Sequence, residues 1–279
     1  MFTIQYTDNP KVVLDVASAI LNSDPLRNNI ILSLLIDRIS LSRTGRYWIL
    51  KKEDEVVGVA AQSPLEYCLN ISCISKTGVK YLSDYFVENE LHFKCISGCE
   101  SCVTEFLKNY NQKWQNAVEY SQKLLLYSLE NQPANISCHG YLKQLKKIEH
   151  KNLILNLLKS FYEEIGEDLL DIMEIEQRII DGRYYLWYNA DNQLTSFICI
   201  SNIFSENYIR LQNIYTISEH RGKGHAYEFV ISLVRQMRSS QMNMVLFTNQ
   251  FYLPSNTLFQ KVGFKIIDKF VTITLKRNG

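Results

Sequence analysis

The sequence predicts an α/β fold in which one structural unit occurs twice in tandem. Two glycine-led segments, Gly45-Arg46-Tyr47-Trp48-Ile49 and Gly182-Arg183-Tyr184-Tyr185-Leu186, lie 137 residues apart in a chain of 279 residues. Helical patterning precedes each segment, and strand and helix patterns alternate after each. Because self-similarity at a fixed distance indicates a duplicated unit, we expect two domains, residues 1–133 and 136–279.

Helices and a hairpin open each half. Apolar residues recur at spacings of three and four between Val12 and Leu35, and again between Leu155 and Met173, which predicts helices there. Each glycine-led segment starts an apolar run that meets a polar turn, at residues 53–55 or 191–193, and a second apolar run follows. This pattern predicts a β-hairpin in each half.

Beyond the hairpins, each half alternates between strand and helix. In the first half we expect strand, helix, strand and helix over 67–73, 77–86, 91–97 and 100–110, and a last strand over 121–129. In the second half the same order is expected over 208–216, 224–238, 243–248 and 255–262, and a last strand over 270–275. Residues 131–135, Asn-Gln-Pro-Ala-Asn, disfavour regular structure and are expected to link the halves.

Composition excludes several classes of protein. The hydrophobic fraction of 46% argues against disorder, and 30 Lys+Arg against 29 Asp+Glu leave a net charge of +1. A nucleic-acid-binding protein needs a basic excess to neutralise phosphates, so we expect no nucleic-acid partner. No basic stretch followed by an apolar one opens the chain, and no apolar run approaches the ~20 residues that span a bilayer. We therefore expect a cytoplasmic protein without a membrane partner.

The seven cysteines are odd in number and spread along a chain too long to need disulfides, so a reducing compartment is expected. His92, Cys95, Cys99 and Cys102 have spacings compatible with zinc ligation. Cys95, however, belongs to the apolar alternation of a strand, and buried free cysteine is common. We expect free thiols there and no metal.

The most informative segment runs from Asn213 to Ala226. A strand pattern ends, a turn containing Gly222 and Gly224 follows, and a helical apolar stripe begins. Such an arrangement directs unpaired backbone N–H groups and the positive end of a helix dipole to one point, which suits a phosphate or pyrophosphate. Glycine lets the backbone approach such a ligand closely. The alternative is a solvated basic turn without a ligand.

The pattern R-x-x-G-x-A, formed by Arg221, Gly224 and Ala226, resembles that of the GNAT superfamily of N-acetyltransferases. A second resemblance follows in residues 254–264, which are similar to the family's helix ending in a Gly-aromatic pair, here Gly263-Phe264. The resemblance covers residues 136–279, and the whole chain resembles two-domain proteins with tandem GNAT-like domains. It implies that each domain has a mixed, mostly antiparallel sheet flanked by helices.

The resemblance also implies a coenzyme site and a reaction. The chain would be an N-acetyltransferase that uses acetyl-CoA as co-substrate and an amine of a small molecule or peptide as acceptor. The coenzyme arm would pair with the strand end, and the pyrophosphate would lie on the turn. The implied coenzyme-binding residues are Ile214, Tyr215, Thr216, Arg221, Gly222, Lys223, Gly224, His225, Ala226, Tyr227, Asn249, Asn256 and Phe259. Because residues 73–78 of the first half lack the arginine and the paired glycines, that half would have lost the coenzyme site.

The catalytic groups follow less directly from the resemblance. Many relatives have a tyrosine, the acid for the departing thiolate, where this chain has Phe259, so Tyr252 is our candidate acid. Residues 208–216 contain no glutamate to act as a base, and neither Gln212 nor Asn213 accepts a proton usefully. A cluster of acidic residues would either attract a cationic acceptor or form a solvated helix face; it comprises Glu163, Glu164, Glu167, Asp168, Asp171 and Glu174. A non-catalytic module that binds acyl-CoA or another protein is the alternative function.

Overall fold

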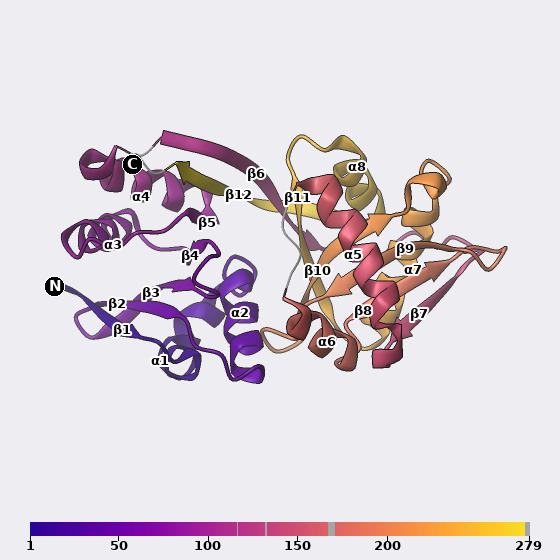
Figure 1. Cartoon of the computed structure of the whole chain (residues 1–279), viewed down its shortest axis with the longest axis horizontal. Helices are drawn as coiled ribbons and strands as arrows, with labels where there is room; N and C mark the ends of the chain where they lie inside the picture. The colour runs from indigo at the N-terminus through magenta and orange to yellow at the C-terminus, as the bar shows by residue number, and fades with distance from the viewer. Residues whose placement is uncertain (116, 132, 167–170, 277–279) are drawn as a thin grey trace. The chain divides into compact units, whose positions relative to one another are not determined.

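The structure, a computed structural model, describes residues 1–115, 117–131, 133–166 and 171–276, and it divides into two compact units (Figure 1). The first unit comprises Met1–Leu126, Thr248–Tyr252 and Ile266–Gly279, and the second comprises Tyr127–Phe247 and Leu253–Lys265. Each unit is therefore built from more than one stretch of the chain. The division at residues 133–136 stays a prediction about the two halves of the sequence.

The first unit has a sheet in the order β1-β2-β3-β4-β5-β12. Its elements are β1 (Phe2–Thr7), α1 (Pro10–Ser23), α2 (Asn29–Ser40), β2 (Arg46–Lys52), β3 (Glu55–Gln62), β4 (Leu69–Ile71), α3 (Lys76–Glu88), β5 (Cys95–Cys99) and α4 (Glu100–Trp114). Strands β4 and β5 are parallel, and the other neighbouring pairs in this unit are antiparallel. Three strands, β6 (Ala117–Leu129), β11 (Asn243–Asn249) and β12 (Phe264–Lys276), contain points at which the chain passes between units.

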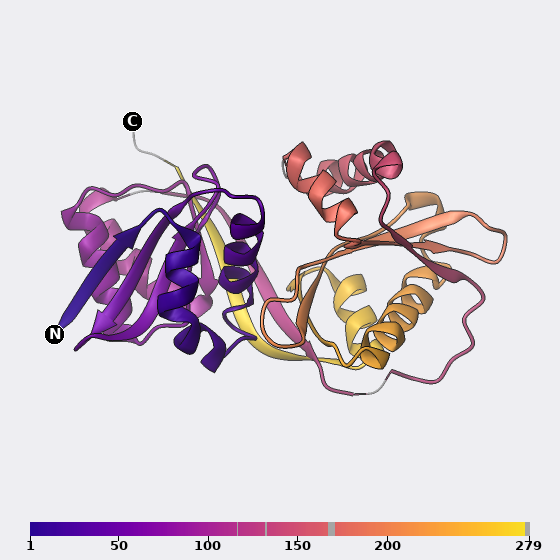
Figure 2. The same cartoon turned by 90° about the horizontal axis from the view of Figure 1, so that it is seen from below.

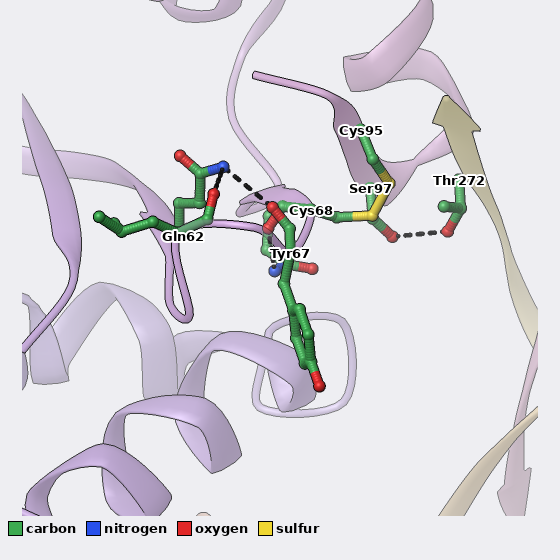
Figure 3. Close-up of a disulfide and its surroundings, with 8 residues drawn as sticks. Gln62, Tyr67, Cys68, Cys95, Ser97 and Thr272 are labelled. Atoms are coloured by element: carbon green, nitrogen blue, oxygen red, sulfur yellow. Dashed lines mark hydrogen bonds between the residues drawn. A yellow bond between two sulfur atoms is a disulfide. The ribbon is translucent and has the colours of Figure 1, made fainter. Parts of the chain in front are cut away.

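The last strand of the chain completes the first sheet. Residues Phe270–Thr274 of β12 pair antiparallel with β5, and Ser97 and Thr272 hydroxyls on the two strands lie 3.0 Å apart (Figure 3). Residues more than 170 positions apart in the sequence thus share one ladder, because a strand edge binds any extended segment of matching register.

The second unit has a sheet in the order β11-β10-β9-β8-β7. Its elements are β7 (Tyr141–Leu145), the 3₁₀ turn Ile148–His150, α5 (Lys151–Ile165), α6 (Ile172–Ile180), β8 (Tyr184–Tyr188), β9 (Leu194–Ile200), β10 (Tyr208–Thr216), the 3₁₀ turn Ser218–His220, α7 (His225–Ser239), β11 (Asn243–Asn249) and α8 (Leu253–Val262). Only β10 and β11 are parallel among these pairs. The expected α/β class, with mixed and mostly antiparallel sheets flanked by helices, is confirmed.

Helices cover both faces of the second sheet, α5 and α6 on one face and α7 and α8 on the other (Figure 2). Strand β8 has the sequence YYLWY, in which Tyr184 and Leu186 pack in the cluster under α5 and α6. Trp187, on the opposite face, stacks on Phe229 of α7 with ring centroids 5.9 Å apart. A strand buried on both faces has no polar side to present, which explains its continuous apolar run.

The expectation that Cys95 is a free thiol is wrong, because Cys68 and Cys95 form a disulfide with Cα atoms 4.4 Å apart (Figure 3). Cys68 immediately precedes β4, Cys95 opens β5, and the parallel register pairs Leu69 with Ile96. The same register brings the two preceding residues side by side. The sequence separation of 27 between the cysteines conceals this proximity. In the described part of the chain, no helix is both long and apolar enough to cross a bilayer.

Candidate functional site

Strand β10 continues past the end of its parallel pairing. Within the described residues, the ladder between β10 and β11 runs from Tyr208↔Asn243 to Leu211↔Leu246, whereas β10 itself extends to Thr216. On its other side, this extension pairs with β9 through Tyr215↔Phe197 and Thr216↔Ser196. The β11-facing side of residues 214–216 is therefore a strand edge to which an extended ligand can add by main-chain hydrogen bonds.

A β-bulge separates the paired part of β10 from this extension. Asn213 has φ = 51°, and the register with β9 shifts between Gln212 and Tyr215. The Asn213 side chain donates from Nδ2 to the hydroxyl of Tyr162 on α5 over 3.0 Å. Bulges redirect a strand and are frequent beside active sites, so the hydrogen bond to Tyr162 anchors the point from which the free edge starts.

The turn after β10 presents a row of unpaired amides. Gly222 and Gly224 have φ values of 73° and 83°, a region that L-residues rarely adopt. A Cβ at either glycine would meet no atom within 4 Å, so open space lies beside both. Among the described residues, no main-chain or side-chain acceptor takes the N–H groups of residues 222–226. Helix α7 begins at His225, so these amides and the positive end of its dipole coincide.

Arg221 ties the turn to the end of β10. Its Nε donates to the carbonyl of Thr216 over 2.9 Å, and its guanidinium lies 5.3 Å from the ring centroid of Tyr215. The same guanidinium pairs with Glu164, at the end of α5, over 2.6 Å. Lys223, farther along the turn, donates from Nζ to the carbonyl of Glu219 over 2.8 Å. The turn is therefore held by its own basic side chains while its amides stay open.

Two histidine rings and one lysine lie close to the start of α7. The rings of His220 and His225 are 6.1 Å apart, and Nζ of Lys261 on α8 lies 4.3 Å from the ring centroid of Tyr227. Ala226, in the first turn of α7, is half-buried. Helix α8 packs against α7, which places Lys261 near the first turn of that helix. An anion at the amides would thus meet positive charge from the turn and from α8.

Phe259 and Asn256, both on α8, make internal contacts. Phe259 is only 1% exposed and packs edge-to-face on Phe264. Asn256 accepts at Oδ1 from the hydroxyl of Tyr127 over 3.1 Å, and Gln260 donates to the same hydroxyl over 3.2 Å. These contacts of Phe259 and Asn256 hold α8 in place within the second unit. Sequence reasoning missed Tyr127, which no local pattern connects with a helix 129 residues away.

Asn249 and Tyr252 belong to the first unit, whereas residues 214–227 belong to the second. Asn249 accepts at Oδ1 from the N–H of Phe251 over 2.9 Å, and its carbonyl accepts from the N–H of Tyr252 over 3.1 Å. Asn249 therefore shapes the turn between β11 and α8. Tyr252 is 53% exposed. Its side chain therefore meets the requirement that a proton donor be accessible to a bound molecule.

The acidic residues of the second half have separate roles. Glu163 is exposed and pairs with Lys159, while Glu164 binds Arg221. Asp171 accepts a hydrogen bond from the N–H of Met173 and so caps α6. Glu174 is 3% exposed and pairs with Arg178. The remaining two, Glu167 and Asp168, lie outside the described residues. The four described carboxylates therefore do not form one exposed acidic surface.

Known proteins resemble this chain in sequence over part of its length and in fold over nearly all of it. Residues 151–264 match the sequence profile of the acetyltransferase (GNAT) family. No curated protein sequence gives a significant match. Among solved structures, the chain is similar to a Drosophila protein from a structural genomics programme, with a TM-score of 0.72, 10% identity and 99% coverage of both chains.

Two other solved structures carry informative descriptions. One is a GNAT-family acetyltransferase from Colwellia psychrerythraea, with a TM-score of 0.63, 11% identity and coverage of 98% of this chain and 100% of that one. The other is a tandem GNAT protein from the clavulanic acid biosynthesis pathway, with a TM-score of 0.60, 10% identity and 99% coverage of both chains. At these identities the similarity establishes the fold.

Proposed function

We propose that the second unit transfers the acetyl group of acetyl-CoA to an amine of a small molecule or peptide. The match of residues 151–264 to the acetyltransferase (GNAT) family profile and the fold shared with a tandem GNAT protein support this proposal. One observation carries this proposal. No acceptor among the described residues takes the amides of residues 222–226, and open space lies beside Gly222 and Gly224. This turn follows the part of β10 that the described ladder with β11 leaves unpaired.

The two features suit the two ends of the coenzyme. A pyrophosphate accepts several hydrogen bonds and carries negative charge, and the turn offers five N–H groups and a helix N-terminus. An extended pantetheine arm offers amide groups that pair with a strand edge, here residues 214–216. In this proposal Arg221, Lys223 and Tyr227 surround the phosphates, and Asn256 and Phe259 fix α8, whose Lys261 lies beside Tyr227.

The proposed reaction is direct attack on the thioester. The amine nitrogen bonds to the carbonyl carbon, the C–S bond breaks, the amine loses one proton, and the coenzyme thiolate gains one. A main-chain N–H at the β10 edge would stabilise the oxyanion, a contribution of about 3 kcal/mol where such a donor is preorganised. An α-amine with a pKa near 8 loses its proton to water readily, which compensates for the absence of a carboxylate in β10.

Tyr252 is the proposed acid for the thiolate. Phe259, at the position where relatives have a tyrosine, is buried and has no proton to donate. Tyr252 is exposed and carries a hydroxyl. Tyr252→Phe removes that hydroxyl with little change in shape, so we expect kcat to fall while the affinity for acetyl-CoA stays unchanged.

Calorimetric titration with acetyl-CoA and measurement of thiol release test the proposal. Gly224→Asp is compared with Gly224→Asn, because both residues have the same shape and tolerate positive φ, whereas only aspartate brings a negative charge to the turn. We expect at least a tenfold larger loss of affinity for Asp than for Asn. Equal losses would contradict phosphate binding at this turn, as would the absence of acetyl-CoA binding to folded wild-type protein.

A non-catalytic acyl-CoA-binding module is the second candidate. The buried Phe259 and the lack of a carboxylate in β10 favour it. Acetyl-CoA binding without thiol release across a panel of amino acids, polyamines and peptide N-termini would support this function. Thiol release with any one amine would eliminate it.

A further inference from the structure

Three free thiols converge in the first unit. Cys73 follows the end of β4, Cys99 ends β5, and Cys102 lies in the first turn of α4. Their sulfur atoms all lie within 4.8 Å of one another, and those of Cys73 and Cys99 are 3.8 Å apart. Cys99 and Cys102 are each 4% exposed, whereas Cys73 is open to solvent. Two of the three cysteines are therefore buried, and solvent reaches the cluster at Cys73.

The sulfur separation matches a metal-centred arrangement. With a Zn–S bond of about 2.3 Å, two sulfurs of a tetrahedral site are about 3.8 Å apart, the distance between Cys73 and Cys99. A disulfide requires about 2.05 Å, so this pair is spaced as joint ligands. The exposed side at Cys73 leaves room for a water as the fourth ligand.

The surroundings favour a thiolate at Cys99, whereas Cys73 and Cys102 are held as thiols until a metal ion displaces their protons. Cys99 directly precedes helix α4, whose N-terminal dipole stabilises a negative charge. Hydrogen bonds from the thiols of Cys102 and Cys73 lower the pKa of Cys99. Hydrogen bonding with Cys102 lowers the pKa of Cys73, as does the Arg27 guanidinium, but the contact with Cys99 and burial outweigh them and raise that pKa to about 11. Cys102 donates in turn to the carbonyl of Ile74 over 3.4 Å.

The cluster occupies the counterpart of the proposed coenzyme site. Parallel strands β4 and β5 are each followed by a helix, as are the parallel strands β10 and β11 of the second unit. Crevices at the carboxyl ends of such parallel strands are common ligand sites. Where the second unit has a glycine turn with open amides, the first unit has thiols.

We propose that Cys73, Cys99 and Cys102 form a binding site for a thiophilic metal ion of the Zn²⁺ type. Binding releases the protons of those thiols that are still protonated. The site differs from the His92, Cys95, Cys99 and Cys102 set considered from the sequence. Cys95 is in a disulfide, and the His92 ring packs on Trp114 and lies within hydrogen-bonding distance of the Tyr110 hydroxyl. The proposal is independent of acetyl transfer.

The test uses the full chain with Cys68 and Cys95 both replaced by serine, so that no thiol arises from reduction of the disulfide. The reduced protein is incubated with Zn²⁺, desalted and analysed for metal content. It is then titrated with Cd²⁺, whose bonds to thiolates absorb in the ultraviolet. We expect one retained Zn²⁺ per chain and a Cd²⁺ signal that saturates at one equivalent.

Single serine variants identify the ligands. Cys73→Ser changes an exposed residue and is expected to fold, to weaken Cd²⁺ binding at least tenfold and to reduce the charge-transfer absorption by about a third. Cys99→Ser is expected to abolish retention of Zn²⁺. Cys138→Ser, a free cysteine of the second unit, is the matched control and should bind as the parent does. The proposal would be overturned if the parent protein retained less than about 0.1 equivalent of Zn²⁺. Equal binding by the Cys73 variant, or a Cys73–Cys99 disulfide found by mass spectrometry in freshly isolated protein, would also overturn it.

Discussion

Arg221 donates a hydrogen bond from Nε to the main-chain carbonyl of Thr216 across 2.9 Å. This contact joins the last residue of β10 to the glycine turn that precedes α7. This hydrogen bond therefore links the strand edge to the turn with the open amides across residues 217–221.

Arg221→Lys should weaken acetyl-CoA binding about tenfold, or about 1.4 kcal/mol. Lysine keeps the charge but has no planar fork to bind Thr216 and Glu164 together. Calorimetric titration measures the effect. Arg235→Lys is the control, because Arg235, farther along α7, donates to the carbonyls of Ile136 and Ala134. Equal affinities of the two variants would show that Arg221 does not organise the site.

Glu164→Gln should strengthen acetyl-CoA binding about threefold, because the Glu164 carboxylate competes with phosphate for the Arg221 guanidinium. The pair is partly exposed, so the free energy of unfolding should change by less than about 1 kcal/mol. Glu163→Gln, whose carboxylate faces Lys159 instead, should leave the affinity unchanged. Weaker coenzyme binding by the Glu164 variant would reverse the interpretation.

Asn213→Gly and Asn213→Val should have different effects. Glycine accepts the positive φ of the bulge and loses only the hydrogen bond to Tyr162, whereas valine must also adopt a strained backbone at a cost of about 1–3 kcal/mol. We expect valine to lower both the free energy of unfolding and acetyl-CoA affinity, and glycine to change each by about 1 kcal/mol or less. Chemical denaturation and calorimetric titration give the two quantities; indistinguishable variants would argue against a structural role for the bulge.

The double variant with serine at positions 68 and 95 should lose about 3–4 kcal/mol of stability, as expected when a 27-residue loop is no longer closed. Urea denaturation of wild type and variant, each with and without reductant, checks this loss. Reductant should destabilise the wild type alone. A loss below about 1 kcal/mol would indicate that the unfolded chain is hardly restricted by this disulfide.

Stability should fall at acid pH through Glu228 in the first turn of α7. Burial alone would raise the pKa of Glu228, but hydrogen bonds from the ring and main-chain N–H of His139 lower it overall. A lowered folded-state pKa means that the stabilisation is present above the ordinary glutamate pKa and is lost as the pH falls through the folded-state value. Glu228→Gln should therefore flatten the acid limb of a plot of unfolding free energy against pH. An unchanged limb would exclude Glu228 as its source.

Much of the fold follows from local patterns. The helix expected over 224–238 is α7, His225–Ser239, and the strand expected over 208–216 is β10. Apolar periodicity fixes such elements because each buries one face or both. The sequence also placed a glycine turn between this strand and this helix, and Gly222 and Gly224 there adopt positive φ, a conformation that other residues avoid.

Long-range partners could not be predicted in this way. The pairing of β12 with β5, the disulfide between Cys68 and Cys95, and the Tyr127–Asn256 hydrogen bond join residues 27 to about 175 positions apart. A strand edge or a thiol carries no local signal of its partner, because many registers are compatible with one sequence. The burial of Phe259 against Phe264 is likewise a result of tertiary packing.

The sequence by itself determined that this chain is a duplicated α/β unit with a glycine turn suited to an anion between a strand and a helix, because hydrophobic periodicity and glycine's backbone freedom are properties of neighbouring residues. Only the tertiary structure decided that no acceptor in the described part of the chain takes the amides of that turn, that Arg221 anchors the turn to Thr216, and that three cysteines meet at the ends of β4 and β5. Those relations depend on strand register and helix packing, which the whole chain sets together.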